Sequence, residues 1–176
     1  GRGAGVNAAE LFRLRVQSLL ARGLAAPAIA SRVRLAGASE VWGGDALAPA
    51  KFLQMIERIS EADGSAGWVA SFGSAGVYLA ALPAETLAEL YSQSPDLVFA
   101  GGLFPLQPAE VVEGGYQVNG TWKFASGCKG ADLLGVGIGA AGGKPRTAVL
   151  RPDQVEIVEN WDVVGLKVTG SHDLRV

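Results

Sequence analysis

The spacing of hydrophobic residues changes near Asp96, and this change constrains the fold more than any other feature of the sequence. Before it, apolar residues recur at helical spacing in Ala-rich segments. After it, they recur every two residues in short segments separated by Gly, Pro and Asn turns. Helices followed by strands predict an α+β fold, and the lack of alternating βαβ units disfavours a Rossmann fold. We expect a helical domain over 1–96 and an antiparallel β-barrel domain over 97–176.

The signals for helices become sharper along the first part of the chain. Asn7 is a capping residue, and Glu10 three residues later completes a box-like start signal. Pro49 suits the first turn of a helix, because its missing N–H would have no partner there. The segment after Gly64-Ser65 is apolar nearly all round, which predicts a central helix. The expected helices span 7–23, 27–35, 49–63, 66–82 and 83–92, with a loop over 37–45.

Asn119-Gly120 is the strongest turn signal in the second part of the chain. A type I′ turn needs positive φ at both central residues, and Asn and Gly tolerate it best. We expect a β-hairpin there, with Trp122, Phe124 and Ser126 on one face of its second strand. Two rings beside a hydroxyl form either core or a wall for a flat, hydrogen-bonding cofactor. The expected strands span 97–100, 116–118, 121–126, 133–138, 147–151, 155–158 and 167–168, with a loop over 101–108.

Composition indicates a folded chain and excludes several kinds of site. Of the 176 residues, 49% are hydrophobic and 18% are charged, which favours a packed core. The net charge of −2 is spread evenly, so no basic stripe marks a nucleic-acid surface. The single cysteine, Cys128, excludes an internal disulfide, and the single histidine, His172, cannot supply a zinc site. We therefore expect no metal site and no nucleic-acid partner.

The ends of the chain bear on its location and completeness. The amino end lacks the order of a signal peptide, and no uncharged apolar run reaches the roughly 18 residues that span a bilayer. We expect a cytoplasmic protein with no membrane segment. The chain starts without Met and stops at HDLRV, within an apparent strand pattern, so we expect a piece of a longer protein.

Three features of the sequence resemble chemical sites, but their surroundings in the sequence argue against each site. Residues 137–142 match GxGxxG, but Pro145 and an expected strand follow in place of the helix that would meet a pyrophosphate. Ser171-His172-Asp173 holds the residue types of a catalytic triad, yet neighbours on a strand point to opposite faces. Cys128 has no cysteine partner and no histidine nearby in sequence, which favours a buried or half-buried thiol.

Three segments carry a family resemblance: EADGSAGWV, AEVVEGGYQVNGTWKFASGCKGADLLGVG and ENWDVVGLKVTGSHDLRV. From about Leu35 onward, the chain resembles the acyl-CoA dehydrogenase superfamily. Its FASGC and TGSHD segments, and Trp161 before a Gly-Leu pair, are most similar to the two-component flavin monooxygenases of that superfamily. Such proteins have a helical domain, a β-barrel and a C-terminal helical bundle, and this chain would end before the bundle.

The resemblance also implies a cofactor and its contacts. Phe124, Ala125 and Ser126 fall on the positions that meet the N5 and O4 edge of a flavin, where Ser126 would donate a hydrogen bond. Trp161 falls on a second aromatic wall, and Phe104 on the preceding loop is included in the implied flavin site. The implied cofactor is FAD or FMN, supplied in reduced form by a partner flavin reductase in the monooxygenase branch. The implied assembly is a homotetramer.

Two departures from the family pattern separate its branches. The loop 101–108 lacks the Thr-Glu-Pro and Gly-Ser-Asp of the acyl-CoA dehydrogenases, which argues against their chemistry. The monooxygenases often place a histidine near the start of 76–83, where this chain has Ala75, Gly76 and Val77. The catalytic acid or base is therefore unassigned, and a structural or surface role is expected for His172.

Three hypotheses for the function of the protein follow from these observations. The first is a flavin-dependent oxidoreductase that hydroxylates a small aromatic or heterocyclic substrate with reduced flavin and O2. The alternative is an FAD-dependent acyl-CoA dehydrogenase, and a second alternative is a non-catalytic fragment or assembly partner. Aromatic residues fill cores more often than they line flavin sites, and Trp122 is assigned to the core on this ground. The substrate itself is not specified by the sequence.

Overall fold

The computed structural model describes residues 47–92, 97–140 and 143–176. The helices expected over 7–23 and 27–35 and the loop expected over 37–45 lie outside these ranges. The described helices are α3 (Pro49–Ala62), α4 (Gly64–Ser71), α5 (Gly76–Leu79) and α6 (Ala84–Leu90), with a 3₁₀ turn η2 (Phe72–Ser74) between α4 and α5. The helices predicted over 49–63 and 83–92 are confirmed as α3 and α6, which end one and two residues earlier than predicted.

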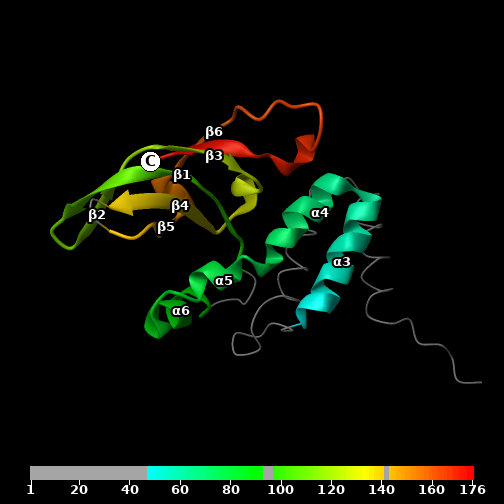
Figure 1. The fold of residues 1–176 in the computed structure, drawn as a ribbon, viewed down its shortest axis with the longest axis horizontal. Helices are drawn as coiled ribbons and strands as arrows, with labels where there is room; N and C mark the ends of the chain where they lie inside the picture. The colour runs from blue at the N-terminus through cyan, green and yellow to red at the C-terminus, as the bar shows by residue number, and fades with distance from the viewer. Residues whose placement is uncertain (1–46, 93–96, 141–142) are drawn as a thin grey trace, which may run out of the picture.

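The single helix predicted over 66–82 is wrong, because the chain turns repeatedly between Phe72 and Leu82. The break separates α4, which packs against α3, from α5 and α6, which lie under the sheets in Figure 1. Val77 and Tyr78 on α5 are 70% and 52% exposed, so this apolar segment is not central throughout. The turn thus redirects an apolar sequence from one packing partner to another.

The α3–α4 pair is built from a cap and a small residue. Asp63 ends α3 and begins α4, where its carboxylate accepts a hydrogen bond of 2.6 Å from the Ala66 N–H. Gly67 faces α3 so closely that an added Cβ would lie 2.8 Å from the Ser60 Cα. Glycine at this position therefore lets the two helix backbones approach. Trp68 on α4 contacts the β region through a hydrogen bond from its Nε1–H to Ser126 Oγ.

The strands are β1 (Phe99–Val112), β2 (Gly115–Val118), β3 (Thr121–Ala125), β4 (Leu133–Ala140), β5 (Arg146–Leu150), β6 (Glu156–Val158) and β7 (His172–Arg175). They form a four-stranded sheet of order β2-β1-β4-β5 and a three-stranded sheet of order β3-β7-β6. The mixed α+β class is confirmed. A wholly antiparallel arrangement is not, because β1 and β4 pair in parallel. The strand predicted over 167–168 is also wrong, since a 3₁₀ turn η5 (Lys167–Thr169) occupies that segment.

The hairpin predicted at Asn119-Gly120 is wrong, because this turn joins two different sheets. β2 pairs with β1 through a turn at Gly114, whose φ is 83°. β3 instead pairs antiparallel with β7, and Gly120 exchanges backbone hydrogen bonds of 3.0 and 3.1 Å with Val176. Neither Asn119 nor Gly120 has the positive φ that a type I′ turn requires, so the predicted turn type is wrong as well, and tertiary pairing overrides the local preference.

The segment 101–108, predicted as a loop, is part of β1 and carries a large bulge. Gly102 pairs with Val136 and Gln107 pairs with Ile138, so an advance of five residues along β1 matches an advance of two residues along β4. The extra residues include Phe104. At the bulge, a Cβ added to Gly137 would lie 2.8 Å from the carbonyl carbon of Leu103. Close backbone approach therefore accounts for this glycine of the GxGxxG match, and β5 follows the motif in place of a helix.

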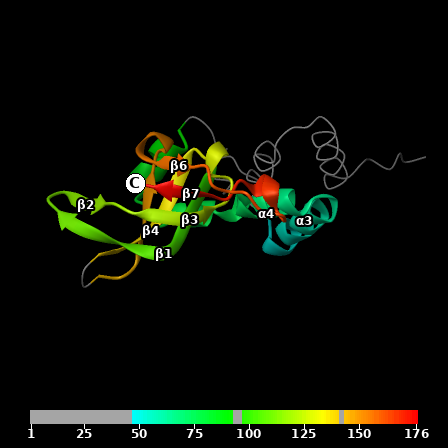
Figure 2. The same cartoon turned by 90° about the horizontal axis from the view of Figure 1, so that it is seen from above.

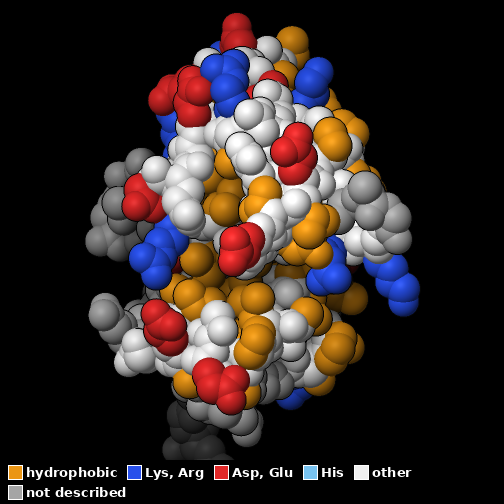
Figure 3. Space-filling model, turned by 90° about the vertical axis from the view of Figure 1, so that its left-hand side faces the viewer, with side chains coloured by type: hydrophobic (Ala, Val, Ile, Leu, Met, Phe, Trp, Pro, Cys, Tyr) orange, Lys and Arg blue, Asp and Glu red, His pale blue; other side chains and the backbone are white. Residues whose placement is uncertain are grey.

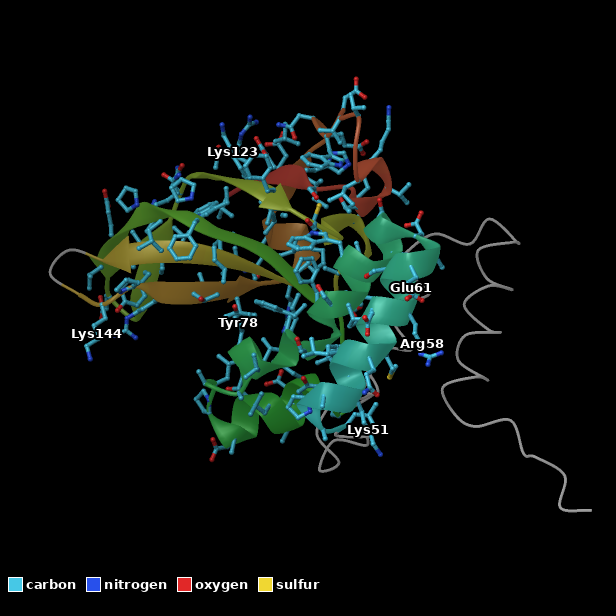
Figure 4. All side chains as sticks on the ribbon, turned by 45° about the vertical axis from the view of Figure 1, so that its right-hand side comes forward. Lys51, Arg58, Glu61, Tyr78, Lys123 and Lys144 are labelled. Carbon is cyan, nitrogen blue, oxygen red and sulfur yellow. The ribbon has the colours of Figure 1, made fainter. Side chains whose placement is uncertain are left out.

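The main core lies between the two sheets and contains Trp122. This side chain is 0% exposed, which confirms its assignment to the core, and its Nε1–H donates a 2.7 Å hydrogen bond to the Gly137 carbonyl. A second cluster joins α5 and α6 to the four-stranded sheet, where the Tyr78 and Phe99 rings lie 6.1 Å apart. Tyr78 points from α5 toward that sheet in Figure 4. Figure 3 shows hydrophobic side chains gathered in the hollow between the sheets and the helices α5 and α6.

The segment between β6 and β7 links the sheets to the helices. It extends past the end of β6 and places η5 against α4, as Figures 1 and 2 show from two directions. Residues of α4, β3, η5 and β7 therefore meet at one corner of the molecule. No helix in the described ranges has the length and apolarity needed to cross a bilayer.

Candidate functional site

The candidate site begins where β3 departs from regular strand geometry. Phe124 has a φ of 61°, and the register between β3 and β7 shifts between Trp122 and Ala125. Because of this backbone rotation, Trp122 is fully buried while the Phe124 side chain is 65% exposed. The prediction that Trp122, Phe124 and Ser126 share one face is therefore wrong for Trp122 and Phe124. Positive φ costs a non-glycine residue about 1–2 kcal/mol, which marks Phe124 as a constrained position.

Ser126 follows β3 and is held in a buried set of hydrogen bonds. Its side chain is 6% exposed. Its Oγ accepts a 3.0 Å hydrogen bond from Trp68 Nε1–H on α4 and lies 2.6 Å from Ser171 Oγ. The next residue, Gly127, has a φ of 74° and donates its N–H to the Thr169 carbonyl at 2.8 Å. The turn after β3 is thus tied to both α4 and the segment before β7.

The set continues through two buried residues that the sequence reasoning did not select. Ser171 Oγ lies 2.7 Å from Thr169 Oγ1, which in turn donates a 2.8 Å hydrogen bond to the Leu166 carbonyl. Thr169 and Ser171 are 2% and 4% exposed. Trp68 was also missed as a site residue. These residues lie in the quoted segments EADGSAGWV and TGSHD, but their meeting depends on tertiary contacts between α4, η5 and β7.

Trp161, which the resemblance implied as a second aromatic wall, lies beside Phe124. The two rings are 6.1 Å apart between centroids, with planes at 78°, an edge-to-face arrangement. The Trp161 indole N–H donates to the Leu166 carbonyl at 3.3 Å. Its backbone N–H donates to His172 Nδ1 at 3.1 Å, so this nitrogen acts as an acceptor. His172 therefore has a structural contact that helps to hold Trp161 in place.

The other predicted cofactor residues are placed differently. Ala125 is fully buried in the core between the sheets, so its backbone rather than its side chain is the group near the site. Phe104 lies in the β1 bulge and is 74% exposed, and its ring has no aromatic partner among the described residues. The structure brings Phe124, Ser126 and Trp161 into one hydrogen-bonded and packed unit but does not join Phe104 to their rings.

Charged groups flank the site without entering it. Lys129 and Glu159 form an exposed ion pair of 2.7 Å, and the hydrogen bond from Lys129 lowers the pKa of the Glu159 carboxyl. Burial raises the pKa of the Cys128 thiol, which lies 3.7 Å from the Gly170 carbonyl. The prediction of a buried thiol is confirmed. Among the described residues, no cluster of His, Cys, Asp and Glu could hold a metal ion.

This arrangement fits a flat aromatic ligand with a polar edge. Phe124 presents an exposed ring packed edge-to-face with Trp161, while Ser126, two residues later, contributes a buried hydroxyl. Lys123 projects from the outer face of β3 in Figure 4, away from the helices. Apolar walls with few polar groups are typical of sites for small molecules and cofactors. A flavin, with its ring system and hydrogen-bonding N5 edge, suits these residues.

Comparisons with known proteins show that the chain is similar to flavin-dependent oxygenases. It is 61% identical over 139 residues to an indole-3-acetate monooxygenase from Pseudomonas putida, covering 77% of this chain and 36% of that protein. It is 36% identical over 133 residues to the oxygenase component of an FADH2-dependent resorcinol hydroxylase from Rhizobium sp. strain MTP-10005, covering 70% and 32%. No family model matches the chain.

The fold gives the same relationship. The crystal structure of the HsaA monooxygenase from M. tuberculosis superposes with a TM-score of 0.77 at 28% identity, covering 94% of this chain and 46% of that one. The chain is therefore a homologue of the two-component flavin-dependent monooxygenases of the acyl-CoA dehydrogenase superfamily. Among its relatives, the indole-3-acetate monooxygenase shows the 61% identity given above, and the chain spans about a third (36%) of that protein's length.

Replacing Phe124 with glycine and with alanine tests the backbone strain at this position. Glycine adopts positive φ freely, whereas alanine keeps the strain, and both remove the exposed ring. We expect Phe124→Gly to be more stable than Phe124→Ala, with a free energy of unfolding about 0.5–1 kcal/mol higher. Denaturant unfolding of the full-length protein measures this difference. Equal stability, or a more stable alanine variant, would show that the strained backbone is absent in solution.

Proposed function

We propose that the whole protein is the oxygenase of a two-component, reduced-flavin-dependent monooxygenase that hydroxylates a small aromatic or heterocyclic substrate. The observation that carries the proposal is the unit of Phe124, Trp161 and buried Ser126, in a chain 61% identical to an indole-3-acetate monooxygenase. An indole that bears a carboxylate is the first substrate class to test, because of the name of that relative.

In this proposal, the chain supplies one wall of a flavin site. Phe124 and Trp161 contact the flavin ring, the Ser126 hydroxyl and the Ala125–Ser126 backbone meet its N5 and O4 edge, and Phe104 contributes from the β1 bulge. The flavin, when bound and reduced, supplies the chemistry that activates O2. Phe124 and Trp161 would orient the ring and keep water from it, while the Ser126 hydroxyl is held by Trp68 and Ser171. The catalytic acid or base remains unassigned.

Two other functions were expected as alternatives. An acyl-CoA dehydrogenase would use FAD and a thioester, but the segment 101–108 lacks the family's Thr-Glu-Pro and Gly-Ser-Asp, and forms a bulged strand. A non-catalytic assembly partner would have no reason to keep a strained, exposed phenylalanine beside a buried hydroxyl. Both observations favour the monooxygenase.

The proposal includes partners, location and assembly. A flavin reductase would supply reduced FMN or FAD, in keeping with the relative that is named as an oxygenase component and as FADH2-dependent. The full-length protein would be a cytoplasmic homotetramer. Its helical and β domains would divide at 96/97, between α6 and β1, and further β structure and a helical bundle would complete the flavin site.

Oxygen incorporation by the full-length protein tests this proposal. FMN or FAD is reduced anaerobically by light, mixed with the protein and indole-3-acetate, and exposed to ¹⁸O2. We expect a hydroxylated product that contains one labelled oxygen, and none when the protein is omitted. Bleaching of bound oxidised FAD by an acyl-CoA would support the dehydrogenase instead. Failure to bind either flavin in either redox state would overturn both enzymatic functions.

A matched pair of serine variants tests the contact to the flavin. Ser126→Ala removes the buried hydroxyl, whereas Ser74→Ala removes an exposed hydroxyl that donates to the Ser71 carbonyl at the turn η2. We expect Ser126→Ala to weaken the binding of reduced flavin about 2- to 10-fold, the range for one lost hydrogen bond. Ser74→Ala should bind like the parent protein. Equal binding by both variants would remove Ser126 from the site.

A further inference from the structure

The hydroxyl chain at the candidate site has a direction that can be worked out from its donors and acceptors. Trp68 Nε1–H is only a donor, so Ser126 Oγ accepts at 3.0 Å. At the other end, the Leu166 carbonyl is only an acceptor, so Thr169 Oγ1 donates its proton at 2.8 Å. The groups at both ends thus restrict the hydroxyls between them.

The two remaining contacts then have one consistent assignment. A hydroxyl has a single proton, and that of Thr169 goes to Leu166, so Ser171 must donate across the 2.7 Å contact with Thr169. With its own proton used, Ser171 must accept across the 2.6 Å contact from Ser126. The chain runs one way, from Trp68 through Ser126, Ser171 and Thr169 to Leu166.

Burial keeps this direction fixed. Ser126, Ser171 and Thr169 are 6%, 4% and 2% exposed, so water has little access to supply another donor or acceptor. Leaving a buried hydroxyl proton without a partner costs about 1–3 kcal/mol, which penalises the reversed direction. Among the described residues, no buried side-chain polar atom lacks a hydrogen-bond partner. The Ser126 proton is therefore directed at Ser171, away from any ligand.

We propose that Ser171 and Thr169 are positioning residues that make the Ser126 hydroxyl an acceptor toward bound flavin, so that the site prefers the reduced cofactor. This inference rests on the proposed function, in which Ser126 meets the N5 edge. Reduced flavin carries a hydrogen on N5, whereas N5 of oxidised flavin is an acceptor. A hydroxyl that can only accept suits the first and opposes the second. This differs from the sequence expectation that Ser126 donates to the flavin.

The ratio of flavin affinities tests the proposal without measuring turnover. The full-length protein is titrated anaerobically with FMN or FAD, oxidised and photoreduced, and the ratio of Kd for the oxidised form to Kd for the reduced form is determined. Ser171→Ala removes the acceptor of the Ser126 proton and frees that proton for the ligand. We expect the ratio to fall about 2- to 10-fold, the equivalent of one hydrogen bond.

Substitutions at Thr169 provide an independent variant and its control. Thr169→Val removes the acceptor for Ser171 while keeping the shape of the side chain, so Ser171 becomes free to donate toward Ser126. The affinity ratio should fall as in Ser171→Ala. Thr169→Ser keeps the hydroxyl and should retain the parent ratio. Near-ultraviolet circular dichroism identifies any variant that fails to fold, and the remaining variant then decides.

The outcomes separate this proposal from the one on which it rests. If the parent protein binds neither form of flavin, the proposed function fails and this inference fails with it. If flavin binds, and folded Ser171→Ala or Thr169→Val retains the parent ratio, the one-way chain is refuted while the flavin site stands. A loss of affinity for both forms by the same factor would show a merely structural role and would also refute the inference.

Discussion

Trp122→Ala should lower the free energy of unfolding by about 3–5 kcal/mol, the range for removing a large buried aromatic side chain. Trp122 is 0% exposed between the two sheets, so its removal leaves a cavity bounded by both. It also leaves the Gly137 carbonyl without the indole N–H that lies 2.7 Å away. Denaturant unfolding of the full-length protein, followed by circular dichroism, measures the loss as a shift in midpoint at constant slope.

One further variant isolates the hydrogen bond of Trp122, and another compares Trp122 with a tryptophan that is only half-buried. Trp122→Phe keeps an aromatic ring but removes the hydrogen bond to Gly137, and should lose about 1–3 kcal/mol. Trp161→Ala removes the same kind of side chain from a half-buried position and should destabilise less than Trp122→Ala. If Trp122→Ala unfolded within about 1 kcal/mol of the parent protein, Trp122 would not be the centre of the core.

Gly137→Ala should destabilise the protein by about 2–3 kcal/mol, because the added methyl group overlaps backbone that has little freedom to move. Its Cβ would lie 2.8 Å from the Leu103 carbonyl carbon and 2.9 Å from Leu106 Cδ2, both in the β1 bulge. Relief of this overlap requires β1 and β4 to separate where their register changes. Phe104, which the bulge carries, should move with it. Thermal or denaturant unfolding measures the expected loss.

Gly139→Ala is the matched control on the same strand. No atom lies within 4 Å of a Cβ built at Gly139, so this substitution should leave stability unchanged or raise it by up to about 1 kcal/mol. Both glycines belong to the GxGxxG match. Equal effects of the two substitutions would contradict the packing explanation for Gly137 given by the structure.

The sequence predicted local features well where neighbouring residues decide them. Pro49 at the start of α3 follows from the chemistry of its missing N–H, and the strand expected after the GxGxxG match is found as β5. The change from helices to strands was also predictable, since periodicity is a property of the segment itself. The family resemblance selected Phe124 and Trp161 as flavin contacts, and the structure adds that their rings pack together, which no local pattern contains.

Other features were beyond the sequence because distant contacts determine them. Asn119-Gly120 links β2 to β3 without the positive φ of a type I′ turn, and the partner of β3 is β7, more than 45 positions further on. The alternation from Trp122 to Phe124 fails because Phe124 adopts positive φ, which no propensity predicts for an aromatic residue. The Trp68–Ser126 hydrogen bond joins residues 58 positions apart, so neither motif alone indicated it. Strand periodicity assumes regular backbone, and the site is where that regularity ends.

The parallel pairing of β1 with β4 has a consequence for how the site assembles during folding. Two parallel neighbours need a crossover connection, and here that crossover contains β2, β3 and the turn bearing Ser126. Closing this loop carries an entropic cost before the central pair forms. The segment that holds Phe124 and Ser126 is thus drawn against β7 in the same process that joins the central strands. Formation of the site and completion of the sheets should therefore be one cooperative event, measurable as coincident folding kinetics for Trp fluorescence and far-ultraviolet circular dichroism.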